Sequence, residues 1–157
     1  MSIKLQTQSY LTFKLQNELF AINVGDVLEI LEMSPITKVP KSPAFMRGVI
    51  NLRGNILPVM DARNKFAMPD AEFTIDTCIV VLNIDSGKEP LLVGAIVDSV
   101  QKVIDIPDED IQVSASMGAM YREDFITGIG KMEDNFVMIL NIDKVFSADD
   151  VYAITES

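Results

Sequence analysis

The sequence contains no histidine, and it has one cysteine among its 157 residues. A chain without histidine lacks the usual general base near neutral pH and the commonest protein ligand of transition metals. Catalytic triads, zinc sites and phosphotransfer through histidine are therefore excluded. The single cysteine, Cys78, has no disulfide partner within the chain. We expect it to pack as a small hydrophobe in the strand-like run Thr77–Leu82 rather than to act as a reactive thiol.

Long apolar runs are also missing. The longest stretch without a charged side chain covers eleven residues, 111–121, whereas a membrane-spanning helix needs about 20 apolar residues. The amino-terminal segment has no apolar core of the kind that a secretory signal carries. We therefore expect a cytoplasmic protein that does not insert into the membrane.

Basic residues are scarce, with 13 Lys and Arg against 23 Asp and Glu and a net charge of −10. This charge opposes non-specific binding to nucleic acid and to anionic lipid. The basic residues are nevertheless clustered, because Met33–Pro69 holds six of them against one acidic residue, a local charge of +5. The window predicts either a solvated basic face or a docking surface for an acidic protein.

Motifs that bind phosphate or metal are absent from the sequence. Gly128-Ile129-Gly130 lacks the third glycine of a dinucleotide fingerprint, and no Gly-Lys pair is followed by Ser or Thr. The acidic run Asp105–Asp110 lacks the glycine and the closing glutamate of a calcium loop. A small enzyme built on paired carboxylates is an alternative, but the sequence offers no apolar pocket to raise one of their pKa values. We expect no catalytic residue, no metal and no cofactor.

Short, alternating apolar runs dominate the remaining sequence. They predict about ten strands with turns at intervals of about 8 to 12 residues, which indicates an all-β sandwich or barrel. Helical signals are confined to one turn at Asp61–Phe66 and to a capping pattern at Ser147–Asp150 that predicts a short C-terminal helix. The predicted strands are Tyr10–Leu15, Glu18–Ile22, Val27–Met33, Val49–Leu52, Ile56–Met60, Thr77–Ile84, Leu91–Val97, Val100–Ile106, Ile126–Lys131 and Phe136–Ile142.

The two halves of the sequence resemble each other. Val24–Leu31 matches Val97–Ile104 in its apolar positions, and Phe45–Val49 matches Phe125–Ile129. A third match, of Asp61–Phe66 with Asp143–Phe146, requires small length changes. Three matches in the same order predict a duplicated five-stranded module, and therefore two small barrels packed into one body.

One long segment carries a specific signature. It runs from Pro43 to Arg63 and reads PAFMRGVINLRGNILPVMDAR. Further patches in a fixed order are Phe20–Ile22, Val27–Ile30, Ile36–Pro40, Val93–Val100, Ile126–Ile129 and Ile139–Ile142. With these patches the chain resembles the CheW family of bacterial chemotaxis coupling proteins, from about Tyr10 to Phe146.

The resemblance implies the fold and the function. It implies two SH3-like five-stranded β-barrel subdomains within one CheW-like domain at residues 10–150, with approximate subdomains 15–75 and 76–146, a first strand that pairs with either, and tails at 1–9 and 151–157. It also implies a non-catalytic adaptor that links chemoreceptor cytoplasmic tips to the regulatory domain of the histidine kinase CheA. Such a protein is recruited to membrane-associated receptor arrays, where other CheW-like domains are further partners.

Partner-binding positions also follow from the resemblance. Positions matching Val27, Glu29, Ile30, Cys78 and Val103 lie on or near a groove between the barrels that accepts the receptor's helical hairpin. For the aliphatic members, ordinary strand packing is the alternative. Residues Gly48, Asn51, Arg53 and Gly54 match the most characteristic family segment. The Arg53 guanidinium is suited to bridge a partner carboxylate, and the alternative is a local salt bridge that fixes the hairpin.

Two other functions are compatible with a small barrel. A nucleic-acid-binding module is one, but the net charge of −10 argues against it. An adaptor of a dedicated, non-flagellar signalling array is the other, and only the receptors and the kinase that it serves distinguish it from a chemotaxis adaptor.

Overall fold

The computed structural model describes residues 6–85, 90–113 and 125–147. The described chain is folded into strands with four short helical segments, which are the 3₁₀ turns η1 (Val24–Asp26) and η2 (Asp108–Asp110) and the helices α1 (Ala62–Lys65) and α2 (Ile142–Val145). Its strands are β1 (Thr7–Leu15), β2 (Glu18–Asn23), β3 (Val27–Glu32), β4 (Met46–Leu52), β5 (Asn55–Asp61), β6 (Cys78–Ile84), β7 (Leu91–Val97), β8 (Ser99–Pro107), β9 (Ile111–Val113), β10 (Ile126–Met132) and β11 (Asn135–Leu140).

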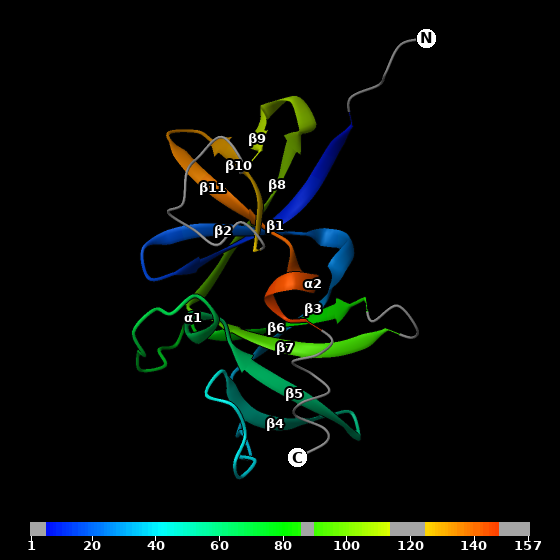
Figure 1. Cartoon of the computed structure of the whole chain (residues 1–157), viewed down its shortest axis with the longest axis vertical. Coiled ribbons are helices and arrows are strands. Elements are labelled where there is room, and N and C mark those ends of the chain that lie inside the picture. Colours follow the sequence, from blue (N-terminus) through cyan, green and yellow to red (C-terminus); the bar gives the residue numbers. More distant parts are fainter. Residues whose placement is uncertain (1–5, 86–89, 114–124, 148–157) are drawn as a thin grey trace.

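The strands form two curved sheets that lie one above the other (Figure 1). Within the described residues the upper sheet has six strands in the order β8-β1-β2-β11-β10-β9, and the lower sheet has five in the order β3-β6-β7-β5-β4. The predicted all-β class with two packed subdomains is confirmed. The strand count of one subdomain was wrong, because the three-residue β9 adds a sixth strand to the upper sheet.

The order of the strands shows that the two sequence repeats exchange their leading hairpins. The first repeat places its hairpin β1–β2 in the six-stranded sheet and its strands β3, β4 and β5 in the five-stranded sheet. The second repeat does the reverse, since β6–β7 pairs with β3 and β5, whereas β8, β10 and β11 join β1 and β2. The approximate division into subdomains 15–75 and 76–146 is therefore wrong, because each sheet contains strands from both halves of the chain.

The second hairpin of each repeat is built alike. Met46 pairs with Met60 before a bulge at Gly48, and Ile126 pairs with Leu140 before a bulge at Gly128. Each residue of the later hairpin is numbered 80 higher than its counterpart. The correspondence continues into the helices, so Asp61–Phe66 matches Asn141–Phe146 without the length changes that the sequence comparison required.

Each sheet is closed by a chain segment that passes over one of these glycines. Thr37 exchanges backbone hydrogen bonds of 2.9 Å with Val49 of β4, and β9 pairs with β10 at Gly128. A Cβ on Gly48, whose φ is +146°, would lie 2.2 Å from the carbonyl oxygen of Thr37. Because no side chain fits there, Gly48 serves the closure of the sheet. Val49 directs its backbone groups to Thr37, which explains how the opposite residue, Pro58, is tolerated inside β5.

Three buried clusters hold the molecule together. One lies within the five-stranded sheet and includes Leu57 and Ile79, and one lies within the six-stranded sheet and includes Ile106 and Val137. The largest lies between the sheets and contains alternate residues of β1, β2, β6 and β7. Strands β6 and β7 are buried on both faces over most of their length, which accounts for their nearly continuous apolar sequences.

The C-terminal prediction is tested only in part. The last predicted strand was expected to reach Ile142, but β11 ends at Leu140 and Ile142 begins α2. Residues 148–150 of the capping pattern lie outside the described residues.

Candidate partner-binding surfaces

Strand β3 separates the predicted site residues into two groups. Its pairing with β6 shifts between Val27 and Glu29, so that Val27 and Ile30 share the face directed to the other sheet. Glu29 lies on the opposite face. The structure therefore does not place Glu29 on the same surface as its aliphatic neighbours, although all of them were predicted to line one groove.

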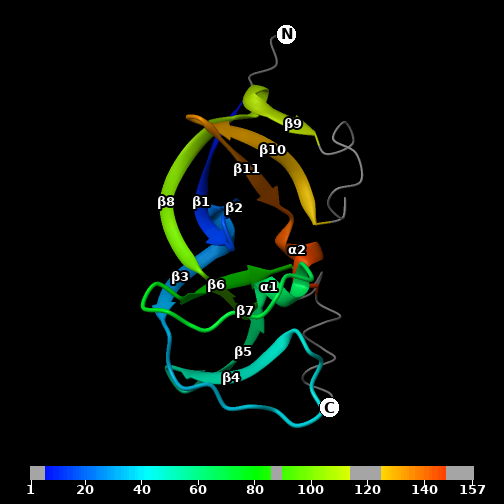
Figure 2. The ribbon, with the colours of Figure 1, turned by 90° about the vertical axis from the view of Figure 1, so that its left-hand side faces the viewer.

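The first group forms what we call the edge-strand surface, which consists of Val27 and Ile30 of β3, Cys78 of β6, and Val100 and Val103 of β8. Both β3 and β8 are edge strands of their sheets, and they lie one above the other along one side of the molecule (Figure 2). Val27, Cys78 and Val100 are half-buried against the shared core. Ile30 and Val103 are 45% and 57% exposed. The surface thus presents apolar side chains from both sheets.

Cys78 is less buried than the sequence indicated. Its side chain is half-buried at the edge of the shared core, where Cys78 pairs with Glu32 of β3 and Val97 of β7. Burial raises the pKa of its thiol, although contact with the backbone of Val100 partly offsets this. A raised pKa leaves little reactive thiolate at neutral pH, which agrees with a packing role.

The second group surrounds the turn between β4 and β5, and we call Glu29, Asn51, Arg53, Gly54 and Ile56 the turn surface. Arg53 and Gly54 occupy the two central positions with φ of 50° and 87°, and the Asn51 side chain accepts a 2.7 Å hydrogen bond from the Gly54 N–H. Both nitrogens at the tip of Arg53 donate to the Glu29 carboxylate. This ion pair connects the hairpin to β3 and raises the pKa of Arg53.

Gly48 belongs to neither surface. It is buried beneath Thr37, so the predicted partner contact is replaced by a structural role in closing the sheet. The close approach of two backbone segments explains why this position of the segment is a glycine.

The basic window is largely neutralised within the molecule. Arg47 forms an ion pair of 2.9 Å with buried Asp61, and Arg63 holds Asp98 through two hydrogen bonds. The Lys65 ammonium lies 4.4 Å from the ring centre of Phe45. With Arg53 bound to Glu29, four of the six cations have partners on the chain itself or face an aromatic ring. The window Met33–Pro69 therefore does not form a free basic docking surface of charge +5.

Comparison with known proteins agrees with this architecture. The family model described as a CheW-like domain matches residues 9–150. The chain belongs to the CheW-like family. It is 31% identical to the chemotaxis protein CheW of Klebsiella aerogenes, over 92% of this chain and 84% of that protein. It is also 31% identical to CheW of Rhizobium meliloti, over 89% of this chain and 88% of the relative.

A solved structure shows the same fold. The scaffolding protein TtCheW of Thermoanaerobacter tengcongensis superposes with a TM-score of 0.81 at 30% identity, covering 92% of this chain and 96% of that one. Membership in the family confirms the function that the sequence signature indicated, which is that of a chemotaxis adaptor linking receptors to CheA.

Sequence reasoning missed two exposed apolar residues at equivalent positions of the repeated hairpins. Ile56 follows the β4–β5 turn and is 77% exposed, and its counterpart Phe136 follows the β10–β11 turn and is 69% exposed. The signal was present in the repeat, since Asn55-Ile56-Leu57 corresponds to Asn135-Phe136-Val137. The repeat therefore places an exposed apolar side chain at the same position of both hairpins.

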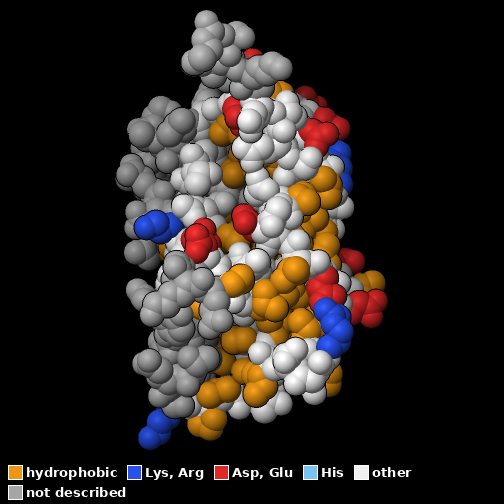
Figure 3. All heavy atoms as spheres, turned by 90° about the vertical axis from the view of Figure 1, so that its right-hand side faces the viewer, with side chains coloured by type: hydrophobic (Ala, Val, Ile, Leu, Met, Phe, Trp, Pro, Cys, Tyr) orange, Lys and Arg blue, Asp and Glu red, His pale blue; other side chains and the backbone are white. Residues whose placement is uncertain are grey.

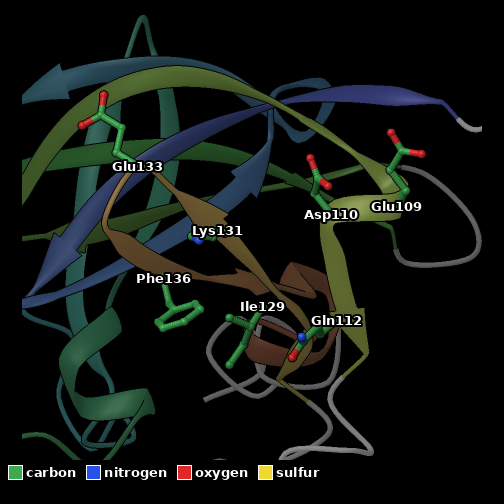
Figure 4. Close-up of a pocket in the computed structure, with 7 residues that line it drawn as sticks. All are labelled: Glu109, Asp110, Gln112, Ile129, Lys131, Glu133 and Phe136. Atoms are coloured by element: carbon green, nitrogen blue, oxygen red, sulfur yellow. The ribbon is translucent and has the colours of Figure 1, made fainter.

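Phe136 also lines a pocket that no sequence motif indicated. The pocket has a volume of about 470 Å³, and Figure 4 shows Phe136 and Ile129 side by side at its apolar part. Acidic side chains from η2 and from the β10–β11 turn stand around it. Its lining residues are Glu109, Asp110, Gln112, Ile129, Lys131, Glu133 and Phe136.

The described part of the chain holds neither a metal-binding cluster nor a membrane-spanning helix. No group of three or more Cys, Asp and Glu residues placed to hold a metal ion occurs there. Likewise, no helix among the described residues has the length and apolar character needed to cross a membrane.

Proposed function

We propose that this chain is a non-catalytic adaptor with two separate docking surfaces. The edge-strand surface binds the helical hairpin at the cytoplasmic tip of a chemoreceptor, and the turn surface binds the regulatory domain of CheA. Holding both partners at once raises the local concentration of kinase at the receptor without new chemistry. The protein acts in the cytoplasm and is recruited to receptor arrays at the membrane.

The proposed receptor binding is supported by a pair of exposed aliphatic side chains on facing edge strands. Ile30 comes from the five-stranded sheet and Val103 from the six-stranded sheet, yet both lie on the face of their sheet that is directed to the shared core. A helix that rests across both strands buries these two side chains together with half-buried Cys78. Docking of an apolar helix face onto such a surface is a common recognition mode.

The proposed binding of the CheA regulatory domain is supported by the turn surface. Exposed Ile56 is next to a hairpin end that the ion pair between Arg53 and Glu29 fastens to β3. Figure 3 shows hydrophobic side chains gathered over the five-stranded sheet, with basic and acidic side chains together at the edge of this face. A fixed hairpin end with an apolar side chain and charged neighbours suits docking against another β-barrel domain.

The test is to separate the two surfaces by substitution. The double variant Ile30→Lys and Val103→Lys should bind a receptor hairpin fragment at least tenfold more weakly while it retains the CheA regulatory domain, and Ile56→Lys should show the opposite pattern. Leu92→Lys, which alters a partly exposed apolar residue of β7, is the matched control. Calorimetric titration of each variant with each partner measures the effect. Wild-type binding of both partners by every variant would contradict the assignment of the surfaces.

A further inference from the structure

Asp98 occupies the point at which the chain crosses from one sheet to the other. Val97 is the last residue of β7 and pairs with Cys78 in the five-stranded sheet. Ser99 is the first residue of β8 and pairs with Lys14 in the six-stranded sheet. The position of Asp98 therefore bears directly on how the two sheets are set relative to each other.

The Asp98 carboxylate connects both sheets through charge-assisted hydrogen bonds. It accepts a 2.7 Å bond from the backbone N–H of Gln16, in the β1–β2 turn, and the backbone N–H of Asp98 donates to the carbonyl of Lys14 at 3.0 Å. On the other side, Arg63 of α1 donates from Nε to Oδ1 at 2.8 Å and from Nη2 to Oδ2 at 2.5 Å. One side chain thus ties a turn of the six-stranded sheet to the helix that follows β5.

The bonding is of the kind that resists exchange with water. The side chains of Arg63 and Asp98 are 16% and 28% exposed, so both are largely shielded from solvent. The two-point contact of a guanidinium with a carboxylate also fixes the angle between the groups. Hydrogen bonding to Asp98 raises the pKa of Arg63. A third bond from Arg63, to the carbonyl of Pro69 at 3.0 Å, holds the guanidinium in place.

The edge-strand surface starts directly beside this connection. Val100 follows Asp98 by two residues and packs, like Cys78, against the shared core, and Val103 lies further along the same strand. The junction at Asp98 therefore determines where the side chains of β8 lie relative to β3 and β6. A helix that contacts both edge strands needs that spacing to be constant.

We infer that Asp98 is a positioning residue for partner binding, which holds β8 at the distance from β3 that the receptor hairpin requires. The inference rests on the proposed function. The shared core keeps the two sheets together, so loss of the Asp98 contacts loosens the edge of the interface while the fold persists. The turn surface lies in the five-stranded sheet alone and does not depend on the junction.

The variant Asp98→Asn tests the inference, because it keeps the shape of the side chain but removes the charge and one acceptor. We expect a receptor hairpin fragment to bind at least tenfold more weakly, the CheA regulatory domain to bind within twofold of wild type, and the Gln16 amide to exchange its hydrogen faster. Asp105→Asn is the control, since it makes the same charge change on β8 at a carboxylate that accepts a hydrogen bond from Ser9 in the neighbouring strand and lies away from the junction. It should bind both partners as the wild type does.

Each other outcome overturns the inference. Unchanged receptor binding by Asp98→Asn would show that the junction does not position the surface, and equal loss of both partners would show a role in folding alone. Arg63→Gln breaks the same contact from the other side and must reproduce the selective loss. If the wild type itself fails to bind the receptor fragment, the proposed function fails instead, which keeps the two failures distinct.

Discussion

At the scale of single residues, the contacts seen in the characteristic segment Pro43–Arg63 stabilise the barrel itself. Gly48 lets the chain at Thr37 pass over β4, and Arg53 and Gly54 form a tight turn of positive φ. Arg53, which was predicted to reach a partner carboxylate, is bound to Glu29 of its own chain. The alternative of a local salt bridge therefore describes its contact in the free protein.

Replacing Gly48 should be costly, whereas replacing Gly54 should not. Gly48→Ala places a methyl group 2.2 Å from a backbone oxygen, so we expect a loss of unfolding free energy of about 3 kcal/mol or more. Gly54→Ala meets no atom within 4 Å and adds only the strain of a positive φ, about 1 kcal/mol. Urea denaturation of both variants measures the difference, and equal stabilities would refute the role given to Gly48.

The pair between Glu29 and Arg53 is open to a charge-exchange test. Arg53→Glu sets two carboxylates against each other and should weaken binding of the CheA regulatory domain, because the hairpin end is released from β3. The double variant Glu29→Arg with Arg53→Glu restores the attraction and should recover binding. A double variant that binds as poorly as the single one would show that Arg53 itself contacts the partner.

At the scale of elements, the pairing of strands is interrupted by bulges, and side chains satisfy the backbone groups that a bulge leaves unpaired. The pairing of β1 with β8 shifts between Leu11 and Phe13, and the buried Thr12 lies at that bulge. Its hydroxyl donates to the carbonyl of Lys102 at 2.7 Å and accepts from the N–H of the same residue at 3.1 Å. One side chain thereby satisfies two backbone groups that the bulge leaves without a strand partner.

Removal of that hydroxyl should destabilise the protein. Thr12→Val keeps the volume but leaves the donor and acceptor of Lys102 unpaired, which should cost about 2 kcal/mol. Thr12→Ser keeps the hydroxyl and loses only a methyl group, which should cost about 1 kcal/mol. Thermal melting of the two variants provides the comparison, and a Val variant as stable as the Ser variant would contradict this account of the bulge.

Most strands were predictable, because alternation and turn residues are local properties of the sequence. The strand predicted at Thr77–Ile84 was recognised by its apolar side chains alone, and the structure adds that these side chains divide between two cores. The pairing of strands was not predictable in this way. Nothing local in β1–β2 shows that it joins the strands of the other repeat, and the contact of Glu29 with Arg53 links residues 24 positions apart. The three-residue β9 is too short to give a pattern.

At the scale of the whole molecule, exchange of the hairpins makes the two sheets interdependent. Phe13, Phe20, Phe66 and Phe125 follow one another through the shared core, with ring centres 5.9, 5.2 and 5.5 Å apart. This row of rings includes residues of both repeats, since Phe13 and Phe20 lie in β1 and β2, Phe66 follows α1 and Phe125 precedes β10. Neither sheet can keep the shared core if the other unfolds.

We therefore expect a single cooperative unfolding transition. Scanning calorimetry should give a calorimetric enthalpy equal to the van't Hoff enthalpy. Leu82→Ala in the shared core and Leu57→Ala within the five-stranded sheet should both lower the transition temperature without splitting it, since each removes a fully buried side chain worth about 2 to 5 kcal/mol. Two resolved transitions in either variant would show that the sheets are independent domains.

The central claim is that this chain holds receptor and kinase together, and a co-sedimentation measurement tests it most directly. Receptor cytoplasmic hairpins are displayed on lipid vesicles and centrifuged with the CheA regulatory domain at increasing concentrations of this chain. The account predicts that the kinase domain sediments in proportion to the chain that is bound. A kinase domain that stays in the supernatant at every concentration, although the chain binds each partner alone, would contradict it.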